Sequence, residues 1–102
     1  MPIYTIAEYC VRASGVEKVK RAIQEFVPYL QEKEAGTRMY AAWQRKDDPT
    51  RFVHFFIFED EAAHTVHANS AAVKSFEAAY GPELVGGSVV FTDYELVAVK
   101  GG

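Results

Sequence analysis

The segment Arg51–Phe58, with the sequence RFVHFFIF, limits the possible folds of this chain more than any other. Its Phe, Val and Ile content is typical of a β-strand. Side chains alternate between the two faces of a strand, so one face carries Phe52, His54, Phe56 and Phe58, and the other carries Val53, Phe55 and Ile57. Both faces are apolar, and a layer of helices can cover only one. The other needs a partner's sheet or another apolar cover, since exposed apolar patches of that size are rare on monomers, and we therefore predict a homodimer.

The rest of the chain predicts an α+β domain of ferredoxin-like order. Apolar residues at helical spacing indicate a first helix that opens at Ser14-Gly15, and a second helical region that follows Asp60, restarts at Ser70 and ends at Tyr80. Strand-like segments are predicted at residues 3–11, 38–45, 51–58 and 89–99. The order β-α-β-β-α-β is the ferredoxin-like plan. A length of 102 residues supports one core, so we expect a single domain over residues 1–102.

Three local signals concern the ends and joints of these elements. Asp48-Pro49-Thr50 predicts a turn that joins the second and third strands as a hairpin. Pro28 falls inside the first helix, so a kink or break is expected near Glu25–Pro28. Gly36 is suited to a left-handed cap after that helix.

Composition excludes several classes of partner. The net charge is −3 and no basic cluster is present, so a nucleic acid is not expected to bind. The chain has no apolar run of membrane-spanning length and no signal peptide, so no membrane association is expected. Cys10 is the one cysteine, which excludes an internal disulfide and fits a reducing cytoplasm.

Two histidines are candidates for acid–base chemistry, because imidazole exchanges a proton near neutral pH. His67 lies on the helix after the third strand, where the alternative is a histidine that caps the helix break. His54 lies mid-strand among phenylalanines, where the alternative is a core histidine bonded to Tyr or to backbone. His64 is expected to be solvated. The pair His64 and His67 is weak evidence for a metal, and no metal is expected.

A set of aromatic residues could bind a flat aromatic substrate. Any one of them could equally be part of the core. No glycine-rich phosphate loop is present, so no bound flavin or nicotinamide, and no other cofactor, is expected. The candidate substrate-binding residues are Trp43, Tyr40, Phe26, Phe55, Phe56 and Phe58.

The chain also resembles the antibiotic biosynthesis monooxygenase family. The resemblance implies a small ferredoxin-like protein that forms a dimeric α/β barrel, with His67 at the family's recurrent histidine. Two departures stand out: Phe56 replaces a glutamate that many members carry, and the first strand lacks the asparagine of haem-degrading members, which argues against haem. The matching residues are Asp48, Pro49, Phe52, Phe58, Asp60, Ala62, Ala63, His67, Ser70 and Phe76, with weaker matches at Gly36-Thr37-x-x-Tyr40 and Val90-Phe91-x-x-Tyr94.

Three functions are compatible with this pattern. The resemblance implies a cofactor-independent monooxygenase that oxidises a quinol or polycyclic phenol with molecular oxygen. A non-catalytic dimeric module that binds a small apolar ligand needs the same pocket and no base. An isomerase or lyase acting on a small carbonyl compound would use His67 as its base. The residues alone do not separate these functions.

Overall fold

The computed structural model describes residues 1–101 and consists of one antiparallel sheet with helices. The strand order β2-β3-β1-β4 confirms the predicted ferredoxin-like α+β plan. The strands are β1 (Ile3–Cys10), β2 (Thr37–Gln44), β3 (Arg51–Phe58) and β4 (Val90–Tyr94); the helices are α1 (Val16–Lys33), α2 (Glu61–Ala68) and α3 (Ala71–Tyr80), with short 3-10 turns at Ala13–Gly15 and Gly81–Glu83.

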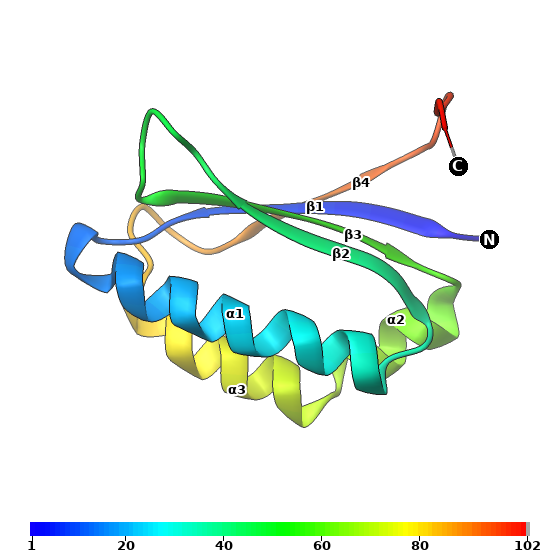
Figure 1. The fold of residues 1–102 in the computed structure, drawn as a ribbon, viewed down its shortest axis with the longest axis horizontal. Helices are drawn as coiled ribbons and strands as arrows, with labels where there is room; N and C mark the ends of the chain where they lie inside the picture. Colours follow the sequence, from blue (N-terminus) through cyan, green and yellow to red (C-terminus); the bar gives the residue numbers. More distant parts are fainter. Residues whose placement is uncertain (102) are drawn as a thin grey trace.

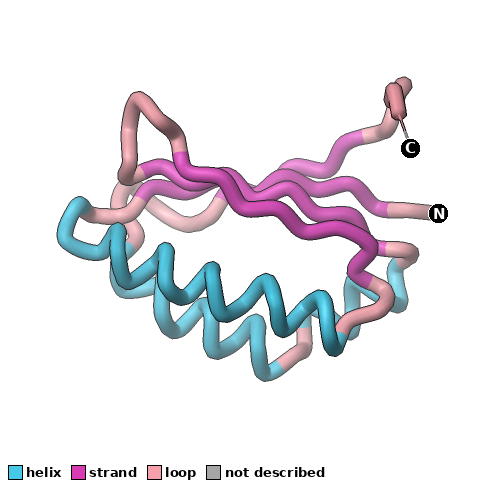
Figure 2. The backbone as a smooth tube through the Cα atoms, in the orientation of Figure 1, coloured by secondary structure: helices cyan, strands magenta, loops and turns pink. Residues whose placement is uncertain are grey.

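All three helices lie on one side of the sheet, and the other side carries no helix (Figures 1 and 2). The two faces of β3 follow this asymmetry. The residues that face the helices are buried, and those on the other face, Val53, Phe55 and Ile57, are only partly buried within the chain. The buried set is Phe52, His54, Phe56 and Phe58. The helices of the same chain therefore cover one of the two apolar faces of this strand.

The core lies between the sheet and the helices. The rings of Phe26 on α1 and Phe76 on α3 stack with centroids 4.6 Å apart, which joins the two helices. Tyr9 on β1 stacks on Phe52 of β3 at 5.5 Å. Burial of a large apolar side chain contributes about 1.5–3 kcal/mol, so these rings account for much of the contact between the layers.

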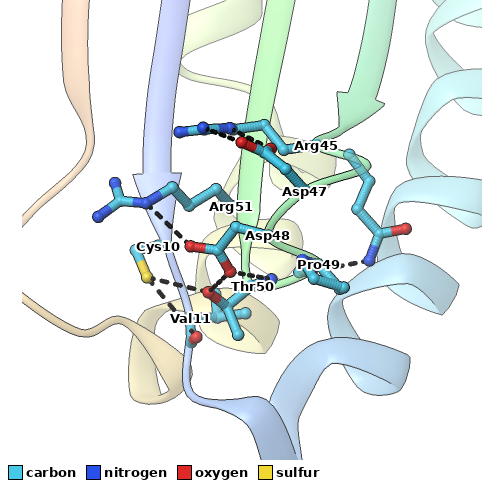
Figure 3. Close-up of polar contacts among 9 residues, drawn as sticks. Cys10, Val11, Arg45, Asp47, Asp48, Pro49, Thr50 and Arg51 are labelled. Carbon is cyan, nitrogen blue, oxygen red and sulfur yellow. Dashed lines mark hydrogen bonds and ion pairs between the residues drawn. The ribbon is translucent and has the colours of Figure 1, made fainter.

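The predicted hairpin between β2 and β3 is confirmed and is closed by side chains (Figure 3). Asp48 accepts hydrogen bonds from the backbone N–H and the hydroxyl of Thr50, and pairs with Arg51. The hydrogen bonds from Thr50 hold the pKa of Asp48 below its usual value. Arg45 pairs with Asp47 across the same turn. The turn thus sets the register that places Ala42 opposite His54.

The structure shows neither the break that was one of the two outcomes expected in α1 nor the left-handed cap expected at Gly36. α1 continues through Pro28 without a break. Pro28 and Gln24, whose carbonyl loses its donor, both lie on the exposed side of the helix, where water can satisfy that carbonyl. Gly36 does not adopt a left-handed conformation. A Cβ at Gly36 would lie 2.6 Å from the Cβ of Ala63, so close packing against α2 explains the glycine.

The last strand is shorter than the predicted 89–99. It ends at Tyr94, which pairs with Tyr4 near the start of β1, so the neighbouring strand ends there too. Beyond it, Leu96, Val97 and Val99 are exposed. These exposed apolar residues have no partner strand in the described part of the chain.

Candidate functional site

A cavity of about 420 Å³ lies between the buried face of the sheet and the helices. This volume is within the roughly 300–1,000 Å³ typical of small-ligand pockets. Most of the surface that lines it is apolar. The aromatic residues around it are Tyr9, Phe26, Tyr40, Phe56, Phe58, Phe76, Tyr80 and Phe91.

His67 reaches this cavity from the last turn of α2. The Asp60 side chain caps that helix by accepting a hydrogen bond from the Ala63 N–H, which fixes where the helix begins. The ring of His67 lies 5.0 Å from that of Phe58 and 6.2 Å from that of Phe56, centroid to centroid. The histidine is therefore held among apolar rings, at the wall of the cavity.

A buried carboxylate orients His67. The Nδ1–H of His67 donates to Oε1 of Glu34 over 2.8 Å, and the hydroxyl of Thr37 donates to the same oxygen over 2.8 Å. Glu34 is 7% exposed, and its Oε2 has no hydrogen-bond partner among the described residues. With Nδ1–H engaged, neutral His67 presents its other nitrogen, Nε2, as a proton acceptor. This is the arrangement of a general base supported by a carboxylate.

His54 has a different environment. Its ring is 1% exposed, and its two nitrogens lie 2.8 Å from the Tyr9 hydroxyl and 2.7 Å from the Tyr40 hydroxyl. Burial lowers the pKa of His54 to about 4, so the imidazole is neutral at pH 7. Both nitrogens are already engaged by hydroxyls, so His67 is the better placed of the two histidines to accept a proton from a ligand.

The structure brings six of the eight predicted site residues together at the cavity: His54, His67, Phe26, Tyr40, Phe56 and Phe58. It places the other two elsewhere. Phe55 lies on the open face of the sheet, and Trp43, which pairs with Val53 across the hairpin, is 54% exposed on that same face. Neither lines the cavity, so their predicted role in substrate binding is not carried forward. His64 is exposed, as expected, and lies at the edge of the cavity.

Sequence reasoning missed two residues that hydrogen-bond the histidines, Tyr9 and Glu34, and also the cavity-lining rings of Phe76, Tyr80 and Phe91. Tyr9 lies two residues after the buried Ala7 on β1, and the alternation of side chains along a strand places both on the inner face. Glu34 follows the end of α1, where a negative charge opposes the helix dipole. A carboxylate at this unfavourable position weakly indicates that another part of the fold stabilises its charge. Among residues 1–101, no group of three or more His, Cys, Asp or Glu side chains could hold a metal ion.

A known protein family matches most of this chain. The family model described as antibiotic biosynthesis monooxygenase matches residues 2–79, which span β1 to α3 and include Glu34, His54 and His67. A search of curated proteins finds no match. In the described residues, no helix is long and apolar enough to cross a membrane.

Solved structures share the whole fold. A candidate antibiotic biosynthesis monooxygenase from Bacteroides thetaiotaomicron VPI-5482 superposes with a TM-score of 0.89 at 15% identity, over 99% of this chain and 94% of its own. A Mycobacterium tuberculosis protein superposes with a TM-score of 0.85 at 19% identity, over 99% of this chain and 100% of its own. A Shewanella oneidensis protein superposes with a TM-score of 0.78 at 26% identity, over 91% of this chain and 88% of its own.

Proposed function

Because this chain belongs to the antibiotic biosynthesis monooxygenase family, we propose that it is a cofactor-independent monooxygenase that oxidises a quinol or polycyclic phenol with molecular oxygen. One observation carries the proposal. His67, supported by the buried carboxylate of Glu34, lies at the wall of an apolar cavity lined by aromatic rings. A phenol bound there would meet a base and a surface suited to flat rings.

The cavity binds and shields the substrate. Phe26, Phe56 and Phe58 offer ring faces and edges against which an aromatic ligand packs. Water is excluded as the ligand fills the apolar space, which strengthens every electrostatic interaction inside it. The bound phenol is then held for proton transfer and for attack by oxygen.

His67 removes the phenolic proton, and Glu34 stabilises the imidazolium that results. The electron-rich phenolate adds molecular oxygen at a ring carbon, and His67 returns its proton to the distal oxygen to form a hydroperoxide. The O–O bond then breaks. The proximal oxygen stays on the ring as a carbonyl, and the distal oxygen leaves as water with the returned proton and the hydrogen of that ring carbon. The substrate supplies all four electrons that reduce the two oxygen atoms, and it leaves as a quinone oxidised by four electrons.

Oxygen uptake with a panel of quinols and polycyclic phenols tests the proposal. We expect at least one compound to give one quinone per molecule of oxygen consumed, with no added flavin, nicotinamide or metal. Panel members that bind, as judged by quenching of tyrosine fluorescence, but consume no oxygen above the rate without protein would favour the binding-module function instead.

We also propose that a second copy of the chain covers the open face of the sheet. Trp43, Phe55 and Ile57 belong to this face, together with Met39 and Tyr94. The chain after β4 turns away from the sheet on the side opposite the helices (Figure 1). A homodimer gives these apolar side chains the cover that the single chain lacks.

A further inference from the structure

Tyr9, His54 and Tyr40 form a buried chain of hydrogen bonds with one hydrogen to spare. Each phenolic hydroxyl carries one hydrogen, and a neutral imidazole carries one on nitrogen. Three hydrogens thus meet two contacts, Tyr9 to Nε2 and Tyr40 to Nδ1 of His54. Each contact uses one hydrogen, so the third has no acceptor within the chain of hydrogen bonds.

The tautomer of His54 decides which tyrosine holds the spare hydrogen. If Nδ1 is protonated, it donates to Tyr40, Tyr9 donates to Nε2, and the hydroxyl hydrogen of Tyr40 is free. If Nε2 is protonated, the roles reverse and the hydroxyl hydrogen of Tyr9 is free. In either state one tyrosine hydroxyl accepts from His54 and has its own hydrogen left to donate.

The cavity is where that hydrogen finds an acceptor. Tyr9, Tyr40 and His54 all line it, and neither hydroxyl makes another hydrogen bond within residues 1–101. Burial raises the pKa of both tyrosines well above its usual value, so both hydroxyls keep their hydrogens at neutral pH. A buried donor without an acceptor is costly, which favours a ligand that supplies one.

The sheet register creates this arrangement. Ala7 on β1 and Ala42 on β2 pair directly with His54, and their small side chains leave room beside the imidazole. Tyr9 and Tyr40 occupy the diagonal positions on the same two strands, from which a long side chain reaches its neighbour. The hydrogen-bonded group is thus set by three strands of the rigid sheet.

We propose that Tyr9 and Tyr40 bind one oxygen atom of the ligand, a carbonyl or phenolate oxygen that accepts the spare hydroxyl hydrogen, and that His54 is the positioning residue that sets which tyrosine donates. The proposal rests on the proposed function for the class of ligand. The ring of Tyr40 also lies 6.1 Å from that of His67, centroid to centroid. A flat ligand with two oxygens, one at His67 and one at the tyrosines, matches both groups. The site therefore favours doubly oxygenated aromatic rings over hydrocarbons of the same shape.

Binding of hydroxynaphthoquinone and of naphthalene, measured without oxygen, tests this assignment. The parent protein should bind hydroxynaphthoquinone more tightly. One of the two variants Tyr40→Phe and Tyr9→Phe, the one that removes the donating hydroxyl, should weaken hydroxynaphthoquinone binding by roughly 10- to 100-fold, the value of a hydrogen bond to a charged group, and the other should weaken it less. Both variants should change naphthalene binding by less than about threefold. Equal losses for both probes, or failure of hydroxynaphthoquinone to bind the parent, would overturn the proposal.

Nitrogen NMR of His54 in the parent protein gives a second readout that needs no variant to fold. Hydroxynaphthoquinone should shift the His54 nitrogens towards a single tautomer, whereas naphthalene should not. His54 nitrogen signals that hydroxynaphthoquinone leaves unchanged at saturation would count against the assignment. Because neither measurement requires turnover, a protein that consumes no oxygen could still pass both tests, which separates this inference from the proposed reaction.

Discussion

The Nδ1–H of His67 donates a 2.8 Å hydrogen bond to Oε1 of Glu34, and so links the last turn of α2 to the residue that ends α1. Both side chains are largely removed from solvent. The carboxylate holds the imidazole in one orientation through this hydrogen bond. This contact distinguishes His67 from His54, whose hydrogen-bond partners are neutral hydroxyls.

His67→Ala should lower turnover of a phenol by roughly 10²- to 10⁴-fold, the usual contribution of a general acid–base group. Steady-state oxygen uptake measures the loss. Glu34→Gln is the matched control: it keeps the shape and an oxygen that accepts from Nδ1–H, and removes the charge. Glu34→Gln should lower turnover by roughly 10- to 100-fold. Full turnover in both variants, at unchanged melting temperature, would exclude this pair as the base.

The stability of the protein should fall as the pH drops from about 6.5 to about 4. His54 has a folded-state pKa of about 4 against an ordinary value of 6.5. Between these values the unfolded chain binds a proton that the folded protein does not, so the free energy of unfolding decreases with falling pH. The free energy of unfolding should fall by roughly 3 kcal/mol in total over this shift in the pKa of His54. Urea denaturation at a series of pH values measures it.

His54→Gln separates this effect from other acid-sensitive groups. An amide offers one donor and one acceptor to Tyr9 and Tyr40 and does not titrate in this range. The variant should show a smaller slope of unfolding free energy between pH 6.5 and 4 than the parent. Identical slopes would mean that His54 is not the group responsible.

Periodicity explains why the layers and faces could be predicted from the sequence. Alternation in Arg51–Phe58 placed His54 and Phe56 on one face and Phe55 on the other, and the structure agrees. It could not say which face meets the helices, because both are apolar. Phe55 was for that reason assigned to the pocket together with residues of the opposite face.

The contacts of the site depend on tertiary geometry that periodicity does not contain. Glu34 and His67 are 33 residues apart and meet only because α1 ends beside α2. Tyr9 meets His54 through the register of β1 on β3, which follows from the pairing of whole strands. The close approach of Gly36 to Ala63 was likewise hidden, since a glycine after a helix is also typical of a left-handed cap.

Gly36→Ala should destabilise the protein by about 1–3 kcal/mol, as expected for overpacking. The new methyl would lie 2.6 Å from the Cβ of Ala63, so the start of β2 and α2 must move apart. Chemical denaturation measures the change. The double variant Gly36→Ala/Ala63→Gly removes the opposing methyl and should recover part of the loss. A single variant as stable as the parent would show that this contact relaxes without cost.

The open face of the sheet should hold the protein together as a homodimer. Light scattering at micromolar concentration should give about twice the chain mass of 11.4 kDa. Phe55→Glu places a charge in the middle of this face, where desolvation in an interface is costly, and should shift the mass towards the monomer. Val66→Glu is the control, because Val66 is an exposed apolar residue on α2, on the other side of the sheet. A parent mass near that of one chain would contradict the homodimer, and equal dissociation by both variants would place the interface elsewhere.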